Sequence, residues 1–421
     1  MHKGNGDSLV RAQALAAQEA ARLLRNASTD EKNAALLAMA TALDEHKGVI
    51  LEANAKDVAG AEAKGISGAL IDRLTLNEAR LKSAANGLRE VVALPDPVGE
   101  TIAMTRRPNG LEVGRVRVPL GVIGIIYEAR PNVTVDAAGL CLKSGNAVIL
   151  RGGSEAIHSN VAIVHVMTKA LEGSGLPKTA IQIIESTDRV ATLELMQQSD
   201  LIDVLIPRGG RGLIRTIREN ATVPIIETGE GNCHIYVDYN APLDMARDIV
   251  INAKCQRPGV CNAVETLLVH KDLAPRFLPV VGPELLERGV LLKGCDESRK
   301  ILSGLEVATE EDWEMEYLDL VLAIRIVDSL EVALTHIETY STGHSEAILT
   351  NDYTNAKIFQ EKVDAAAVYV NASTRFTDGQ QFGLGAEIGI STQKLHARGP
   401  MGLNELTSTK FVIAGNGQIR A

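Results

Sequence analysis

The stretch around Cys261 combines a reactive side chain with a local pattern that can present it. Pro258-Gly259 indicates a turn before the cysteine, and the apolar run from Val264 to His270 after it is typical of a strand. A thiol held between a turn and a strand can stand at the floor of a cleft, where its thiolate acts as a nucleophile. The alternative is that Cys261 is a small buried hydrophobic residue, as free cysteines commonly are.

The other cysteines limit the chemistry that the chain can offer. There are 5 in all, an odd number at wide spacings, namely Cys141, Cys233, Cys255, Cys261 and Cys295. This pattern is unlike a secreted disulfide framework, and no Cys-x-x-Cys or His-x-x-x-His pair suggests a metal site. Cys255 and Cys233 are the rival nucleophiles, and Cys233 is expected to be packed because it lies in a glycine-rich segment.

Two glycine loops are candidate phosphate sites. Arg151-Gly-Gly and Arg208-Gly209-Gly210 each follow a predicted strand and precede a predicted helix. The N–H groups at a helix start can bind phosphate. Neither loop is a Gly-x-Gly-x-x-Gly fingerprint or a Walker loop, so an ordinary strand-to-helix turn stays open as the alternative.

The thiol and the glycine loops need a framework, and the sequence predicts two α/β series behind a helical region at 8–94. The first series has strands at 118–126, 147–150, 181–184, 204–206 and 223–227, with helices at 135–144, 155–172, 189–198 and 213–220. The second has strands at 266–270, 320–326, 347–350 and 367–371, with helices at 273–288, 329–338 and 354–363. Such alternation predicts doubly wound parallel sheets, with a ligand cleft between the two series.

A hairpin is predicted between the helical region and the first series. Pro108-Asn109-Gly110 separates alternating segments at 102–106 and 111–117, and Asn-Gly is a strong hairpin signal. The hairpin is either an oligomerisation arm or a local rim. A short strand at 409–413 would pair with it, within one chain or from a neighbouring subunit.

Bulk properties exclude some functions. The net charge of −10 argues against nucleic-acid binding, because phosphate backbones need basic surfaces. The first residues have no apolar signal-peptide core and no apolar run is long enough for a membrane span, so a cytoplasmic protein without membrane contact is expected. A length of 421 residues predicts two or three domains.

The chain resembles the aldehyde dehydrogenase superfamily nearly end to end, and four motifs carry the resemblance. Pro119-Leu-Gly-Val122 leads to Arg130-Pro-Asn132, as in the loop with that superfamily's catalytic asparagine. Gly145-Asn-Ala-Val-Ile-Leu-Arg151 is similar to its cofactor strand, with arginine in place of the commoner lysine. Ile226-Glu227 and the segment 256–262 resemble its glutamate strand and its nucleophile segment.

Four further stretches, at 231–238, 256–265, 342–348 and 391–402, resemble the γ-glutamyl phosphate reductase subfamily. The fold that this resemblance implies is α/β and aldehyde dehydrogenase-like, with two doubly wound parallel-sheet domains and a small β oligomerisation arm. Residues 1–100 and 118–230 would form the cofactor-binding domain, and 231–404 the catalytic domain. Residues 101–117 and 405–421 would form the oligomerisation hairpin and tail of a homodimer or homotetramer.

The activity implied by the resemblance is NADPH-dependent reduction of L-glutamyl 5-phosphate to L-glutamate 5-semialdehyde and phosphate, the second step of proline biosynthesis from glutamate. Cys261 would form a thioester, and Asn132 would stabilise the oxyanion. Whether glutamate 5-kinase contacts the enzyme to pass on the labile acyl phosphate is left open. Glu227 matches the general base of hydrolytic relatives, and here it would be pulled away or structural.

The resemblance also implies binding residues. Arg151, Gly209, Gly210 and Glu316 would bind NADP(H), although Glu316-Tyr-Leu departs from the usual Glu-x-Phe. A guanidinium at Arg151 favours a 2′-phosphate and therefore NADP. The substrate's anionic groups would be held by Arg257, Lys394, His396 and Arg398, and its ammonium by Glu387.

The sequence leaves two other functional hypotheses open. One is a dehydrogenase that oxidises a semialdehyde to an acid with NAD, which would need no phosphate. The other is a non-enzymatic relative that kept the fold, against which Cys261 and Asn132 both argue.

Overall fold

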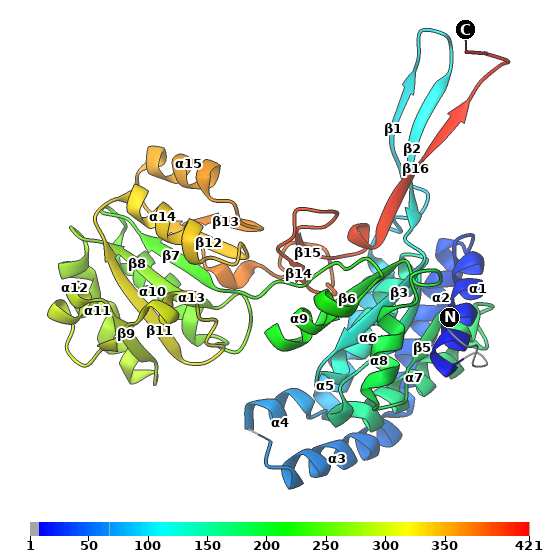
Figure 1. The fold of residues 1–421 in the computed structure, drawn as a ribbon, viewed down its shortest axis with the longest axis horizontal. Coiled ribbons are helices and arrows are strands. Elements are labelled where there is room, and N and C mark those ends of the chain that lie inside the picture. Colours follow the sequence, from blue (N-terminus) through cyan, green and yellow to red (C-terminus); the bar gives the residue numbers. More distant parts are fainter. Residues whose placement is uncertain (1–7, 67, 421) are drawn as a thin grey trace, which may run out of the picture. The chain divides into compact units, whose positions relative to one another are not determined.

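The computed structural model describes residues 8–66 and 68–420, which fold as two compact units (Figure 1). Unit 1 runs to Glu227 and also includes Gly383–Gly389 and the chain from Met401 onward. Unit 2 comprises Thr228–Phe382 and Ile390–Pro400. The sequence placed the main boundary at 230/231, and it did not foresee the two returns of the chain near 383 and 401.

Unit 1 is built on a parallel sheet with strand order β5-β4-β3-β6. Its strands are β3 (Val122–Tyr127), β4 (Ala147–Arg151), β5 (Ile181–Ile183) and β6 (Val204–Arg208). The crossover helices are α6 (Pro131–Lys143), α7 (Ile157–Leu171), α8 (Arg189–Met196) and α9 (Arg211–Asn220). The preceding helices are α1 (Leu9–Leu24), α2 (Thr29–Glu45), α3 (Lys47–Ala63), α4 (Gly68–Leu74) and α5 (Glu78–Ala93). β3 and β4 are buried along their whole length, as expected for strands covered on both faces.

Three predicted boundaries in unit 1 are wrong, each for a local reason. The strand predicted at 118–126 is divided at Gly121, which has a φ of +128° that favours glycine. The strand predicted at 223–227 is reduced to one bridge between Leu205 and Ile225, since Pro224 has no N–H to donate to a ladder. α6 begins at Pro131 and not at 135, because proline is well suited to the first turn of a helix, so Asn132 lies on a helix and not in a loop.

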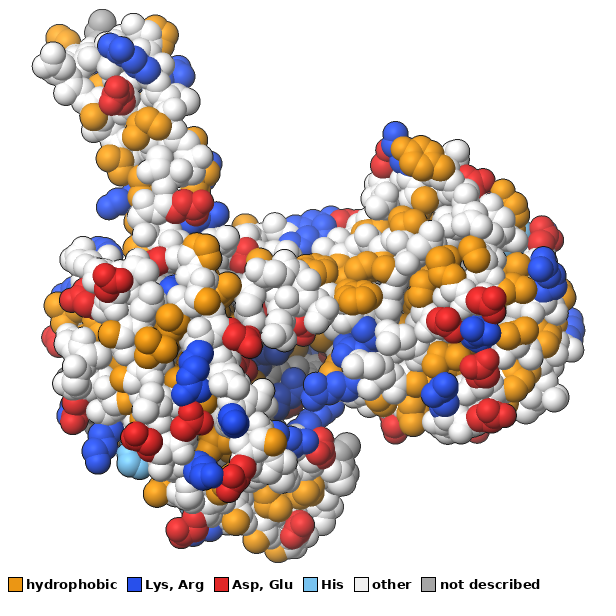
Figure 2. All heavy atoms as spheres, turned by 180° about the vertical axis from the view of Figure 1, so that it is seen from behind, with side chains coloured by type: hydrophobic (Ala, Val, Ile, Leu, Met, Phe, Trp, Pro, Cys, Tyr) orange, Lys and Arg blue, Asp and Glu red, His pale blue; other side chains and the backbone are white. Residues whose placement is uncertain are grey.

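The predicted hairpin is confirmed as β1 (Thr101–Arg106) and β2 (Glu112–Pro119), which pair antiparallel. β16 (Thr407–Ala414) pairs antiparallel with β2 of the same chain and completes a three-stranded sheet. Met104, Phe411 and Ile413 are exposed apolar side chains on this sheet. Figure 2 shows hydrophobic, acidic and basic side chains interspersed along it.

Unit 2 has a seven-stranded parallel sheet with strand order β10-β9-β11-β8-β7-β12-β13. Its strands are β7 (Cys233–Val237), β8 (Val264–His270), β9 (Leu291–Gly294), β10 (Glu306–Val307), β11 (Val321–Val327), β12 (Ser345–Leu349) and β13 (Ala367–Val370). Its helices are α10 (Leu243–Cys255), α11 (Ala274–Glu287), α12 (Asp296–Ile301), α13 (Glu310–Glu314), α14 (Leu330–Tyr340) and α15 (Tyr353–Lys362). A two-stranded ladder joins β14 (Ile390–Ser391) to β15 (Gly399–Pro400).

Within 8–66 and 68–420, no helix has the length and apolar character needed to cross a bilayer. In the same part of the chain, no group of three or more His, Cys, Asp or Glu side chains is placed to hold a metal ion.

Candidate active site

Cys261 lies in the loop 256–263, which connects α10 to β8 at the amino end of the unit 2 sheet. Cys261 is partly exposed to solvent. The rival Cys255 is the last residue of α10, and it lines a surface pocket with Ile251, Glu284 and Arg288. Burial raises the pKa of the Cys255 thiol, which disfavours its thiolate.

The main chain of Cys261 is held by the segment that leads into β7. A Cβ added to Gly231 would lie 2.7 Å from Cys261 Cα, and closer still to the carbonyl carbon and oxygen of Cys261. Only glycine therefore permits this approach of the two backbones. The Gly231 N–H donates to Glu316 Oε1 at 2.8 Å.

Cys233, two residues further on, contacts the same carbonyl. Its Sγ donates to Cys261 O at 3.1 Å, and the side chain is fully buried. Burial raises the pKa of Cys233 well above its usual value, and the charge of Glu346 acts in the same direction. Cys233 therefore stays a neutral thiol that orients the nucleophile loop, which confirms the expectation that it is packed.

Asn262 fixes the other side of the loop. Its Nδ2 donates to Thr377 O at 2.9 Å and to Arg375 O at 3.3 Å, and its own carbonyl accepts from Thr374 Oγ1 at 2.7 Å. Asn262 is buried while its neighbour Cys261 is partly exposed. These contacts attach the loop to the turn at 374–377.

Arg375 adds a cation to this site that sequence reasoning missed. Its Nε donates to Gln256 Oε1 at 2.9 Å, and its Nη1 donates to Asn262 Oδ1. Burial lowers the pKa of Arg375, and the nearby positive charge of Arg257 lowers it further, while the charge of Cys261 acts in the opposite direction. No motif marked this residue, and only its place just after β13 could have drawn attention to it.

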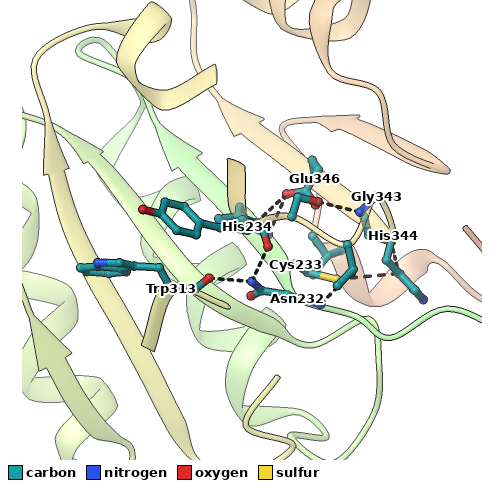
Figure 3. A network of polar contacts seen from close by, with 12 residues as sticks. Asn232, Cys233, His234, Trp313, Gly343, His344 and Glu346 are labelled. Atoms are coloured by element: carbon teal, nitrogen blue, oxygen red, sulfur yellow. Dashed lines mark hydrogen bonds and ion pairs between the residues drawn. The ribbon is translucent and has the colours of Figure 1, made fainter. Parts of the chain in front are cut away.

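A buried network holds the start of β7 rigid behind the loop (Figure 3). The Asn232 side chain donates to Trp313 O at 2.7 Å and to Tyr340 O at 2.9 Å. The N–H and Nδ1 of His234 lie 2.9 Å and 3.1 Å from Glu346 Oε2. His234 and Glu346 are fully buried, so this part of the structure has little freedom to move.

His344 belongs to the same region and lies beside Cys233. Its Nδ1 is 3.8 Å from Cys233 Sγ and 2.8 Å from Ser345 Oγ, whose hydroxyl lies 2.6 Å from Thr377 Oγ1. Figure 3 shows the imidazole pointing toward the Cys233 sulfur. The family motif at 342–348 therefore packs behind the nucleophile loop.

A buried ion pair joins the two ends of the nucleophile loop. Lys254 on α10 contacts Glu265 on β8, and both side chains are inaccessible to solvent. Burial lowers the pKa of Lys254 and raises that of Glu265 to about 8, against the opposing effect of the partner charge. Each charge is tolerated here because the other is present.

The residues predicted to bind substrate fall into separate groups. Arg257 is exposed in the nucleophile loop. Lys394 and Arg398 both contact the Asp364 carboxylate, and His396 lies between them in sequence with a φ of +71°. Glu387 is part of unit 1.

The residues predicted to bind cofactor lie mainly at the carboxyl ends of the unit 1 strands. Arg151 ends β4, where its Nε donates to Thr192 Oγ1 at 2.9 Å and its Nη2 donates to Thr187 O at 3.4 Å. Gly152 must lack a side chain, because an added Cβ would meet Asn160 Nδ2, which is buried without a hydrogen-bond partner. Glu316 differs from the other predicted cofactor residues, because it lies in unit 2, where it accepts a hydrogen bond from the Gly231 N–H.

A carboxylate lies at the second glycine loop. Gly210 is the N-cap of α9, and its N–H donates to Glu128 Oε2 at 3.1 Å. An added Cβ at Gly209 would lie 2.6 Å from the Glu128 carboxyl carbon. A phosphate at this helix start would have to replace that carboxylate.

Asn132 and Glu227 are the remaining predicted chemical residues of unit 1. Asn132 is exposed in the first turn of α6. Glu227 contacts the Arg218 guanidinium through both carboxylate oxygens. Both carboxylate oxygens are engaged by the guanidinium, which agrees with the interpretation that Glu227 has a structural role.

Comparison with known proteins gives a consistent result. The aldehyde dehydrogenase family profile matches residues 3–287. The chain is 65% identical to the gamma-glutamyl phosphate reductase of Moorella thermoacetica, over 96% of this chain and 97% of the relative. It is 62% identical to that of Heliobacterium modesticaldum, with the same two coverages.

Solved structures extend this likeness to the fold. The crystal structure of gamma-glutamyl phosphate reductase from Thermotoga maritima matches with a TM-score of 0.96 and 53% identity, over 98% of this chain and 100% of that one. An acetylating aldehyde dehydrogenase from Geobacillus thermoglucosidasius matches with a TM-score of 0.70 over 98% and 97% of the two chains. At 19% identity, this match shows a similarity of fold alone.

Proposed function

This chain belongs to the aldehyde dehydrogenase family, and on that premise we propose that it reduces L-glutamyl 5-phosphate to L-glutamate 5-semialdehyde and phosphate with NADPH, within proline biosynthesis. The observation that carries the proposal is the loop 256–263. Gly231, Cys233 and Asn262 fix its main chain while the Cys261 residue stays partly exposed. Such a loop presents a preorganised nucleophile.

Cys261 Sγ forms a bond to the acyl carbon, and the bond from that carbon to the phosphate oxygen breaks. The acyl group is then held as a thioester. Negative charge builds on the carbonyl oxygen in this step, and the Asn132 amide is the donor that we assign to it. When Cys261 is later released, its sulfur takes back the electron pair of the C–S bond and the aldehyde leaves.

The cofactor that we assign to this chain is NADP(H), which when bound supplies the hydride that reduces the thioester. The carboxyl end of β4 suits such a ligand, because Arg151 provides a guanidinium there. Arg151 can hold a 2′-phosphate, which favours NADP over NAD. Gly209-Gly210 would hold the diphosphate once Glu128 has moved aside.

We assign the other parts of the chain on the same basis. Unit 1 would bind the cofactor, and unit 2 would supply the nucleophile and bind substrate through Arg257, with Lys394, His396 and Arg398 as further candidates. Glu387, which belongs to unit 1, is the candidate for the substrate's ammonium group. Glu316 would orient the cofactor ribose. The exposed apolar residues of the β1-β2-β16 sheet would join subunits of a homo-oligomer.

The test is whether oxidation of the aldehyde depends on phosphate. Glutamate 5-semialdehyde and NADP⁺ should give NADPH only when phosphate or arsenate is supplied, because phosphate is the acceptor of the acyl group. NAD(P)H formation without either anion would instead indicate a hydrolytic dehydrogenase. The pairing of Glu227 with Arg218 supports the phosphate-dependent result.

A further inference from the structure

The turn at 374–377 brings Arg375 against the nucleophile loop, 119 positions along the chain from its contact Gln256. Two of its N–H groups donate to Gln256 and Asn262, which flank Cys261 in sequence. A guanidinium has five N–H donors, and the structure gives the remaining donors of Arg375 no partner among the described residues. Arg375 is therefore held in place by two hydrogen bonds and still has N–H groups that can donate to a ligand.

Arg257 brings a second guanidinium to the same loop. It is exposed, and the structure gives it no hydrogen bond or ion pair among residues 8–66 and 68–420. Arg257 directly follows Gln256, which accepts a hydrogen bond from Arg375 Nε, and the charge of Arg257 lowers the pKa of Arg375. The two cations therefore repel each other. Without an anion this arrangement is unfavourable.

No carboxylate within the described part of the chain forms an ion pair with either arginine. The negative charge of Asp378 raises the pKa of Arg375, but the two side chains form no ion pair. Asp378 Oδ1 instead accepts from the N–H groups of Gln380 and Gln381 at 3.0 Å and 3.2 Å. By contrast, Lys394 and Arg398 share Asp364. Arg257 in the nucleophile loop and Arg375 against it are thus two cations that form no ion pair with a carboxylate in 8–66 or 68–420.

We propose that Arg257 and Arg375 together bind the phosphate group of the acyl phosphate and hold it as the leaving group when Cys261 attacks. This inference rests on the proposed function and identifies the residues that recognise phosphate. The Sγ–C bond forms, the C–O bond breaks and its electron pair leaves on phosphate. The thiol proton ends on the departing group, so HPO₄²⁻ is released. Two guanidinium groups match the charge and the oxygen geometry of that product.

The first test is the KM for inorganic phosphate in the phosphate-dependent oxidation of glutamate 5-semialdehyde. Arg257→Gln and Arg375→Gln should each raise it about tenfold or more, since each removes a charge-assisted hydrogen bond, and the KM for the semialdehyde should change by less than about twofold. Arg288→Gln is the matched control, because Arg288 is an exposed arginine beside the rival thiol Cys255. A raised KM for the semialdehyde with an unchanged KM for phosphate would overturn the proposal.

The second test needs no turnover. Inorganic phosphate should slow alkylation of Cys261 by iodoacetamide in the wild type, and this protection should be lost in Arg257→Gln and kept in Arg288→Gln. If Arg375→Gln does not fold, Arg257→Gln and Arg375→Lys decide the result. If phosphate does not support turnover in the wild type, the proposed function fails, but protection still tests the arginine pair. Absence of protection in the wild type would overturn the proposal that Arg257 and Arg375 bind phosphate.

Discussion

Gly231→Ala is the substitution that most directly perturbs the placement of the nucleophile. The added Cβ would lie 2.7 Å from Cys261 Cα and nearer still to the carbonyl group of Cys261. These are main-chain atoms, so no side-chain rotation can relieve the overlap. The segment 230–232 cannot easily withdraw, because Asn232 is tied to Trp313 O and Tyr340 O. The loop of Cys261 must therefore move.

The expected effect is on activity more than on folding. A displacement of about 1 Å at a reacting atom typically costs on the order of 100-fold in rate, so kcat should fall by about that factor. The accompanying loss of stability should be about 1–3 kcal/mol, as for other overpacked sites. The assay is kcat for phosphate-dependent semialdehyde oxidation on protein shown by circular dichroism to be folded, with a thermal melt for stability.

Two glycine variants serve as controls for Gly231→Ala. Gly60→Ala adds a Cβ with nothing within 4 Å, in the last turn of α3, and should leave kcat unchanged. Gly229→Ala meets side-chain atoms of Thr392, including Oγ1 at 2.7 Å, which can shift, so its effect should be smaller. A folded Gly231→Ala protein with wild-type kcat would refute the claim that this contact positions Cys261.

Three further predictions concern charges. Lys254→Met should lower the free energy of unfolding by about 3–5 kcal/mol, because it leaves the Glu265 carboxylate buried alone, and Lys254→Met with Glu265→Leu should recover most of that loss in a denaturant titration. Burial raises the pKa of Asp136 to about 6, above its unfolded value of 3.8, so its ionisation destabilises the fold above pH 6 and not below pH 4. Asp136→Asn should therefore raise the stability by about 1–2 kcal/mol at pH 7.5 and leave it unchanged at pH 4, and equal gains at both pH values would contradict this. Glu128→Gln should lower the KM for NADPH about two- to fivefold, since it removes a negative charge from the Gly210 N–H, and a higher KM would show that Glu128 assists binding.

The parts of the site that are local in sequence were predictable. A Pro-Gly turn, a cysteine and a strand-like run placed Cys261 in a loop before β8, and Asn109-Gly110 placed the β1–β2 hairpin. Asn132 was assigned to a loop because the helix period becomes visible only after it, whereas Pro131 in fact starts α6. Local pattern thus located these elements better than it located their ends.

The long-range contacts were not predictable from pattern. Arg375 meets Gln256 and Asn262 only because the chain folds back after β13, and no spacing rule joins positions 119 or 113 residues apart. The same holds for Gly231, whose need for a missing side chain depends on where the main chain of Cys261 lies. Glycine and arginine are common residues, so their types alone did not mark these two.

The most direct measurement compares Cys261→Ser and Cys255→Ser with the wild type in phosphate-dependent reduction of NADP⁺ by glutamate 5-semialdehyde. Both substitutions replace a thiol by a hydroxyl, and the two residues lie at opposite ends of one short segment, so each controls for the other. We predict that Cys261→Ser abolishes turnover while Cys255→Ser keeps most of it. Loss of activity in Cys255→Ser, with activity retained in Cys261→Ser, would contradict the account.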